Sequence, residues 1–138
     1  MTTGPVTLST HVLDATTGRP AAGVEVRLEH RGPDGWSPAG EGQTGADGRL
    51  RLPGGAAESG FKPGGAAESG FKPGGAAESG FEPGVYRITF GSGAYFQARG
   101  SSSFYPEVTV TFDMTASGEH YHVPLLLSPF AYSTYRGS

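Results

Sequence analysis

The chain has 138 residues, enough for one small domain with a single hydrophobic core. Its formal net charge at pH 7 is -3 and no lysine or arginine run occurs, so nucleic acid and anionic membranes are not expected partners. Cysteine is absent, which excludes a disulfide framework and a thiolate metal site. No apolar run is long enough to span a bilayer, and the first residues lack a secretory signal pattern. We therefore expect a soluble, cytoplasmic protein.

Alternating apolar and polar residues, the pattern of half-buried strands, recur along most of the chain. In residues 6–13, Val6, Leu8 and Val12 share one face. Ser9 and His11 point the other way. Further strands are expected over residues 24–29, 49–52, 85–90, 107–112, 119–127 and 130–135, and one short helix over residues 93–98. Short strands separated by Gly, Pro and Asp turns predict an all-β, two-sheet antiparallel sandwich.

Residues 54–83 consist of three ten-residue repeats, Gly-Gly-Ala-Ala-Glu-Ser-Gly-Phe-Lys-Pro, with Glu82 replacing lysine in the third copy. Each copy holds one large apolar residue (Phe61, Phe71 and Phe81), which is too little apolar area to offset the ordering of the chain. We expect the repeats to form an expanded, mobile loop between two strands of a single domain spanning residues 1–138. Because the flanks of the three phenylalanines are nearly identical, any of them is expected to be able to dock against the sheet edge.

Polar side chains with useful chemistry lie on the outer faces of three predicted strands. His120 and His122 face away from the core side of their strand, and His11 and Arg49 do the same on theirs. Most polar residues on an outer sheet face are simply solvated. His120 and His122 also have a spacing that allows a shared metal, but no third ligand accompanies them. Alternation alone therefore leaves both a solvated and a functional role open for these residues.

Several segments carry a resemblance to a known family. They are Thr10-His11-Val12-Leu13-Asp14, Gly18-Arg19-Pro20-Ala21, Asp47-Gly48-Arg49, Phe104-Tyr105-Pro106-Glu107-Val108, His120-Tyr121-His122-Val123-Pro124-Leu125-Leu126-Leu127-Ser128-Pro129 and Tyr132-Ser133-Thr134-Tyr135-Arg136-Gly137-Ser138. Together they resemble the 5-hydroxyisourate hydrolases, or transthyretin-related proteins, of the transthyretin-like superfamily. The terminal Tyr-Arg-Gly-Ser is the signature that separates these hydrolases from the thyroid-hormone carriers. The resemblance covers the whole chain except the repeats.

The resemblance implies a transthyretin-like sandwich that assembles as a homotetramer, a dimer of dimers, with active sites at the mouths of a central channel. It implies catalytic roles for His11, Arg49, His122 and Ser138. Substrate-binding roles are implied for His11, Arg49, Tyr135 and Arg136, with Tyr135 narrowing the channel into a pocket. No metal or other cofactor is required.

The implied reaction is the hydrolysis of 5-hydroxyisourate to 2-oxo-4-hydroxy-4-carboxy-5-ureidoimidazoline in urate degradation. Histidine has a pKa suited to activating water, and the sequence leaves open whether His122 or His11 does so. Arg49 is expected to anchor the substrate through its forked donors. The alternative is a carrier of small aromatic ligands without enzymatic activity, which has the same fold. The polar, titratable residues favour the hydrolase.

Overall fold

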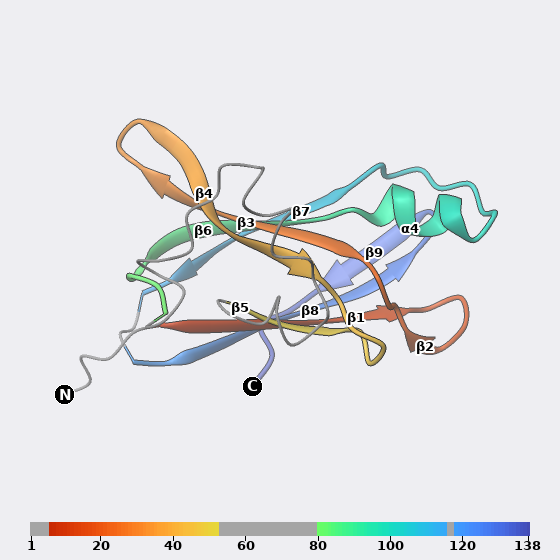
Figure 1. Ribbon diagram of the computed structural model, residues 1–138, viewed down its shortest axis with the longest axis horizontal. Coiled ribbons are helices and arrows are strands. Elements are labelled where there is room, and N and C mark those ends of the chain that lie inside the picture. The colour runs from red at the N-terminus through yellow and green to blue at the C-terminus, as the bar shows by residue number, and fades with distance from the viewer. Residues whose placement is uncertain (1–5, 53–79, 116–117) are drawn as a thin grey trace.

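The computed structural model describes residues 6–52, 80–115 and 118–138. In chain order the elements are β1 (Thr7–Asp14), β2 (Arg19–Pro20), β3 (Glu25–Gly32), β4 (Gly35–Gln43), β5 (Arg49–Leu52), β6 (Gly84–Phe90), the helix α4 (Ser92–Ala98), β7 (Val108–Met114), β8 (His120–Ser128) and β9 (Ala131–Thr134). One sheet has the strand order β2-β1-β8-β9, with β5 also paired to β1, and the other has the order β4-β3-β6-β7. The sheets lie as two layers with α4 at one end (Figure 1), which confirms the expected sandwich.

The core lies between the two sheets, because every second side chain of the central strands points inward. In β1, Leu8 and Val12 are buried, whereas Ser9 and His11 on the opposite face are only half-buried. In β5 both leucines are buried and both arginines are exposed. Full burial of one large apolar side chain contributes about 1.5–3 kcal/mol, so this alternation fixes which face of each strand points outward.

One strand pair departs from the expected antiparallel pattern. β1 and β8 run parallel, with Thr7 opposite His120 and Ser9 opposite His122. Parallel strands need a long connection, and here it includes the whole second sheet. The N-terminal strand and a strand near the C-terminus therefore lie side by side in the middle of one sheet.

The strand β4 was not predicted from the sequence. Its buried positions are Gly40 and Gly42, so no alternation of large apolar residues marks it. A Cβ atom at Gly40 would lie 3.5 Å from a methyl group of Leu52, in ordinary van der Waals contact. The small inner face of β4 therefore lies close to Leu52 of the opposite sheet, and its glycines explain why the strand has a weak sequence signal.

Asp14 ends β1 and joins that strand to α4. The residue is 1% exposed, and its carboxylate accepts hydrogen bonds from the Thr16 backbone N–H at 2.9 Å and the Tyr95 hydroxyl at 2.8 Å. Burial raises the pKa of the Asp14 carboxyl, but hydrogen bonds from Thr16, Tyr95 and Thr17 outweigh burial and hold it below the usual 3.8. The end of the strand that carries Ser9 and His11 is thus fixed by a satisfied buried carboxylate.

Phe81, in the third repeat, belongs to the core. It is 3% exposed, its ring lies 5.6 Å from that of Tyr86, and its backbone exchanges hydrogen bonds with Val6 at 2.7 and 3.0 Å. Only two residues separate Phe81 from Gly84, where β6 begins, so the third copy continues directly into the second sheet. The first two copies, and with them the expected mobile loop, lie outside the described residues.

We expect Phe81→Ala to lower the free energy of unfolding by about 3–5 kcal/mol, because it removes a buried aromatic side chain. Phe61→Ala and Phe71→Ala are matched controls, since they make the same change in nearly the same local sequence. Their effects are expected to stay within about 0.5 kcal/mol, because the site beside Val6 holds one ring. Chemical denaturation of the three variants measures the difference. Equal losses at all three positions would show that the copies share the site.

Candidate active site

The pairing of β1 with β5 and β8 brings His11, Arg49 and His122 onto one outer sheet face. His11 lies opposite Arg49 in the antiparallel β1–β5 pair, and Ser9 lies opposite His122 in the parallel β1–β8 pair. Neighbouring strands lie about 4.8 Å apart, so these side chains are within reach of one another. Three strands that are distant in sequence thus build one polar surface.

His122 is the best-positioned base on this surface. Its Nδ1 atom lies 2.8 Å from the Ser9 hydroxyl oxygen, and the side chain is half-buried. Burial lowers the pKa of His122, and the nearby charges of Arg49, His11 and His120 lower it further, against an opposing hydrogen bond with the Ser9 backbone. The imidazole is therefore neutral at neutral pH and can accept a proton.

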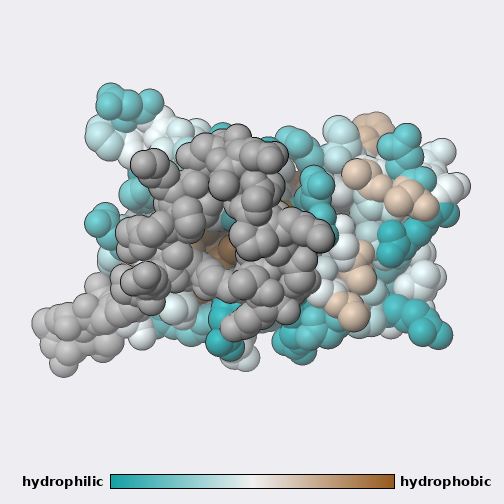
Figure 2. Space-filling view, viewed as in Figure 1, coloured by the Kyte–Doolittle hydropathy of each residue, from teal (hydrophilic) through white to brown (hydrophobic). Residues whose placement is uncertain are grey.

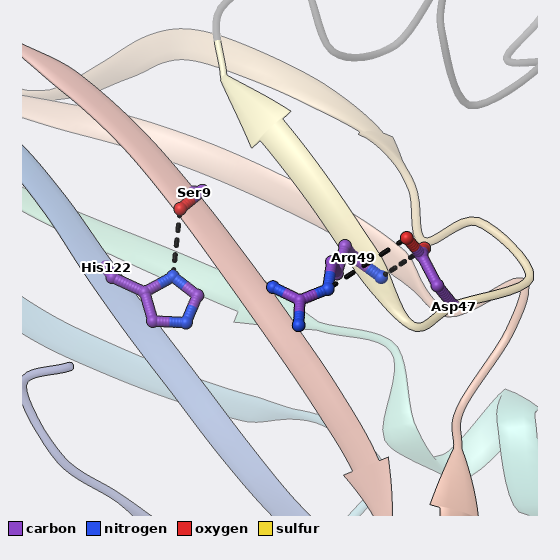
Figure 3. A network of polar contacts seen from close by, with 4 residues as sticks. All are labelled: Ser9, Asp47, Arg49 and His122. Atoms are coloured by element: carbon purple, nitrogen blue, oxygen red, sulfur yellow. Dashed lines mark hydrogen bonds and ion pairs between the residues drawn. The ribbon is translucent and has the colours of Figure 1, made fainter. Parts of the chain in front are cut away.

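Arg49 is the first residue of β5 and follows directly on a turn. The Asp47 carboxylate accepts a hydrogen bond from the Arg49 backbone N–H at 3.0 Å and lies 3.9 Å from Nε of its guanidinium. Gly48 in this turn has φ +76°, and a Cβ atom there would lie 2.5 Å from the Val12 carbonyl oxygen. The Arg49 side chain remains 60% exposed, and Figure 3 shows its guanidinium and the His122 ring pointing toward one another across β1.

The C-terminal segment folds back over His122. The Gly137 backbone N–H donates to the His122 carbonyl oxygen at 2.9 Å. A Cβ atom at Gly137 would lie 2.5 Å from Cδ2 of His122 and 3.1 Å from Cγ of Pro124, so only glycine allows this approach. Ser138 follows directly and is exposed. The chain end therefore lies beside the candidate base.

The two residues before Gly137 border a hollow at the edge of the sandwich. Tyr135 is 59% exposed and, with Arg136, lines a cavity of ≈ 330 Å³ between β7 and the β8–β9 pair. The Arg136 guanidinium lies 4.6 Å from the centre of the Tyr121 ring, and its Nη2 atom lies 3.3 Å from Oε1 of Glu119. Tyr121 points to the core side of β8, so Arg136 extends around the strand edge from the His122 face.

Two residues that sequence reasoning left outside the site are joined to it. His120 was considered only as a solvated residue or a metal ligand, yet its Nδ1 lies 2.6 Å from the Thr7 hydroxyl and its Nε2 lies 2.8 Å from the Ser9 hydroxyl. Alternation placed Ser9 and His11 on the same face, but only the parallel β1–β8 register reveals the contacts with the histidines.

No metal site accompanies the histidines in the parts of the chain that the structure describes, since no group of three or more His, Cys, Asp or Glu side chains there could hold an ion. Within those same ranges, no helix is long and apolar enough to cross a membrane.

We expect Arg49→Met to raise the pKa of His122, because removing a nearby positive charge favours the protonated imidazole. Arg51→Met is a matched control: Arg51 lowers the pKa of His120, after the larger effect of burial, so this variant should raise the pKa of His120 instead. Titration of the imidazole protons by NMR measures both. An unchanged His122 pKa in Arg49→Met would contradict the placement of Arg49 beside the base.

A two-sheet sandwich with this histidine–arginine surface defines a class of protein. The chain belongs to the HIUase/Transthyretin family, whose family profile matches residues 8–137. It is 41% identical over 133 residues to a 5-hydroxyisourate hydrolase of Salmonella dublin, covering 95% of this chain and 80% of that protein.

Solved structures of two kinds resemble the fold. The Klebsiella pneumoniae 5-hydroxyisourate hydrolase aligns with a TM-score of 0.70 and 29% identity, over 99% of this chain and 96% of that one. Sea bream transthyretin in complex with thyroxine aligns with a TM-score of 0.71 and 31% identity, over 94% and 93% of the two chains. Overall shape therefore does not separate hydrolase from carrier, and the side chains of the site must do so.

Proposed function

We propose that this protein is a 5-hydroxyisourate hydrolase that forms 2-oxo-4-hydroxy-4-carboxy-5-ureidoimidazoline in urate degradation. The observation that carries the proposal is the His122 imidazole, held by Ser9, facing Arg49 and lying beneath the C-terminal Gly137. The names of the Salmonella and Klebsiella relatives support the choice of substrate.

The reaction opens a six-membered ring at an amide-type carbonyl, so it needs a base, a group that stabilises the oxyanion and a proton for the leaving nitrogen. We assign the base to His122 rather than His11. Its lowered pKa keeps it neutral, and the Ser9 contact at Nδ1 leaves Nε2 free to take a proton from water. General base catalysis of this kind is typically worth about 10²–10⁴ in rate.

Arg49 and His11 are proposed to bind the substrate. Arg49 is permanently charged, and its guanidinium can donate two hydrogen bonds to the ring oxygens as negative charge develops. His11 lies opposite Arg49 in the β1–β5 register, so the two residues are neighbours on the same outer sheet face.

The chain end is proposed to close the site. Tyr135 and Arg136 bind the substrate, and Ser138 orients water or substrate beside His122. The contacts of Arg136 with Glu119 and Tyr121 support a second role for this residue, which is to hold the chain end in place.

The competing function is a small-ligand carrier, which the likeness to the thyroxine complex favours. Steady-state turnover and calorimetric titration with thyroxine separate the two. We expect turnover of 5-hydroxyisourate and no thyroxine binding at micromolar concentration. Thyroxine binding without turnover would favour the carrier and contradict the hydrolase.

We propose that the active form is a homotetramer built as a dimer of dimers. β7 and β9 each have one partner strand in the described ranges, so their other edges are open to a second chain. Large apolar side chains are also exposed near the end that holds α4, including Phe104, Phe130 and Tyr132, and the visible face carries apolar patches toward that end (Figure 2). Light scattering during serial dilution, with activity measured in parallel, tests whether tetramers alone are active.

The repeats are proposed to be a tolerant insertion. We expect excision of residues 54–73, which removes two copies and keeps Phe81, to leave kcat/KM within about threefold. One reason is that the free energy of loop closure changes by only about 0.6 kcal/mol for each doubling of loop length. The other is that Arg49 is at the start of β5, at the end of the strand away from the repeats. Kinetics and light scattering on the shortened protein test this. A large loss of activity, or dissociation to dimers, would make the repeats part of the working enzyme.

A further inference from the structure

Four outward-facing side chains of β1 and β8 form one continuous row of hydrogen bonds. The Thr7 hydroxyl lies 2.6 Å from Nδ1 of His120, whose Nε2 lies 2.8 Å from the Ser9 hydroxyl. The same Ser9 oxygen lies 2.8 Å from Nδ1 of His122 (Figure 3). Ser9 therefore bridges the half-buried His122 to the exposed His120.

The parallel register of β1 and β8 produces this row. Thr7 lies opposite His120 and Ser9 lies opposite His122, and all four residues have the same outward orientation because side chains alternate along a strand. Each histidine thus receives a hydroxyl partner from the neighbouring strand. The row runs from the candidate base, His122, through Ser9 and the exposed His120 to Thr7.

The Ser9 hydroxyl has one proton, so it can donate to only one of the two histidines while it accepts from the other. If Nδ1 of His122 donates to Ser9, the Ser9 hydroxyl must donate to Nε2 of His120. His120 then carries its proton on Nδ1 and donates it to Thr7. In the reverse arrangement, the Thr7 hydroxyl donates to Nδ1 of His120 and Nε2 of His120 donates to Ser9. The Ser9 hydroxyl then donates to Nδ1 of His122. The tautomers of the two histidines are therefore coupled through Ser9.

We propose that Ser9 and His120 form a proton relay for His122, an inference that rests on the proposed hydrolase function. As water attacks the substrate carbonyl, the new C–O bond forms and a proton of water joins Nε2 of His122. The Nδ1 proton of His122 passes to Ser9 while the Ser9 hydroxyl proton passes to Nε2 of His120. His122 is then neutral with its proton on Nε2, and the positive charge lies on His120.

The same steps in reverse complete the reaction. When the C–N bond breaks, Nε2 of His122 gives its proton to the leaving nitrogen. His120 returns its Nε2 proton to Ser9, and Ser9 returns a proton to Nδ1 of His122. Water has then supplied one proton to the leaving nitrogen, and both histidines are neutral again.

The surrounding charges explain why such a relay is useful. Arg49 from β5 and His11 from β1 both disfavour positive charge on His122. Transfer to His120 moves that charge to an exposed ring, where water screens it better than at His122. Partial burial and then Arg51 lower the pKa of His120, so it too is neutral before the transfer.

The first test removes the bridging hydroxyl. We expect Ser9→Ala to lower kcat about tenfold or more while KM stays within about twofold, because proton transfer is impaired and substrate contacts remain. Ser9→Thr keeps a hydroxyl on the same carbon and should recover most of the rate. Ser37→Ala, an exposed serine of β4 in the other sheet, controls for loss of a hydroxyl elsewhere. A loss in Ser9→Thr as large as in Ser9→Ala would overturn the relay.

Chemical rescue tests the exposed end of the row. In His120→Ala, added imidazole should restore kcat in proportion to its concentration, which a merely structural role of His120 would not produce. No rescue, or a full rate without imidazole, would overturn the proposal.

Nitrogen NMR of the unliganded protein tests the relay without turnover, so failure of the relay can be distinguished from failure of the proposed function. We expect His122 to carry its proton on Nδ1 in the unaltered protein and to lose this preference in Ser9→Ala. An inactive protein with coupled tautomers would refute the hydrolase assignment alone. An active protein in which Ser9→Ala changes neither the His122 tautomer nor kcat would refute the relay alone.

Discussion

His122→Ala is expected to lower kcat/KM at least about a hundredfold, because the variant loses the base that activates water. Arg49→Ala should give a loss of similar size, since the developing negative charge loses its forked donor. Neither change touches the core: His122 is half-buried on an outer face and the Arg49 side chain is 60% exposed. Initial rates with 5-hydroxyisourate measure the effect, and circular dichroism checks the fold.

Two matched controls sharpen this result. His30→Ala and Arg31→Ala make the same changes on β3 of the other sheet, so they should keep kcat/KM close to that of the unaltered protein. A near-full rate in His122→Ala would show that His11, or a group outside this surface, is the base. A near-full rate in Arg49→Ala would show that the substrate is anchored elsewhere.

Removal of residues 135–138 is expected to lower activity far more than stability. The deletion takes away Tyr135, the chain end over His122 and the Ser138 hydroxyl, yet β9 already ends at Thr134. We expect a loss of at least about a hundredfold in kcat/KM, with the unfolding midpoint changed by only a few degrees. Kinetics and thermal unfolding of the shortened chain measure the two effects.

Gly137→Ala is a finer version of the same experiment. Its new methyl group would lie 2.5 Å from Cδ2 of His122, so either the chain end or the imidazole must move. Gly32→Ala is the control, because the nearest atom to a Cβ there is 3.7 Å away. Full activity in both the truncated protein and Gly137→Ala would remove the terminal segment from the site.

Alternation predicted the sandwich and the outward faces of β1, β5 and β8, because one-sided burial leaves a period of two in the sequence. It did not predict β4, whose inner face is made of glycines, or that Phe81 would pack in the core. Phe81 is held by backbone hydrogen bonds with Val6, a contact between distant parts of the chain that local sequence patterns do not encode.

The site was predictable as a set of residues but not as an arrangement. Alternation placed Ser9, His11, Arg49 and His122 on outer faces, yet which of them are neighbours depends on strand register. For this reason the pattern indicates only a solvated residue or a metal ligand at His120. Its contact with Ser9 exists because β1 and β8 run parallel in one register, which no period-two pattern specifies.

The most direct test of the central claim is the ultraviolet decay of 5-hydroxyisourate, generated in the cuvette by enzymatic oxidation of urate. The protein should accelerate the decay in proportion to its concentration, and an equal amount of His122→Ala should accelerate it at least about a hundredfold less. Decay that proceeds at the same rate with and without the folded protein would contradict the assignment as a hydrolase.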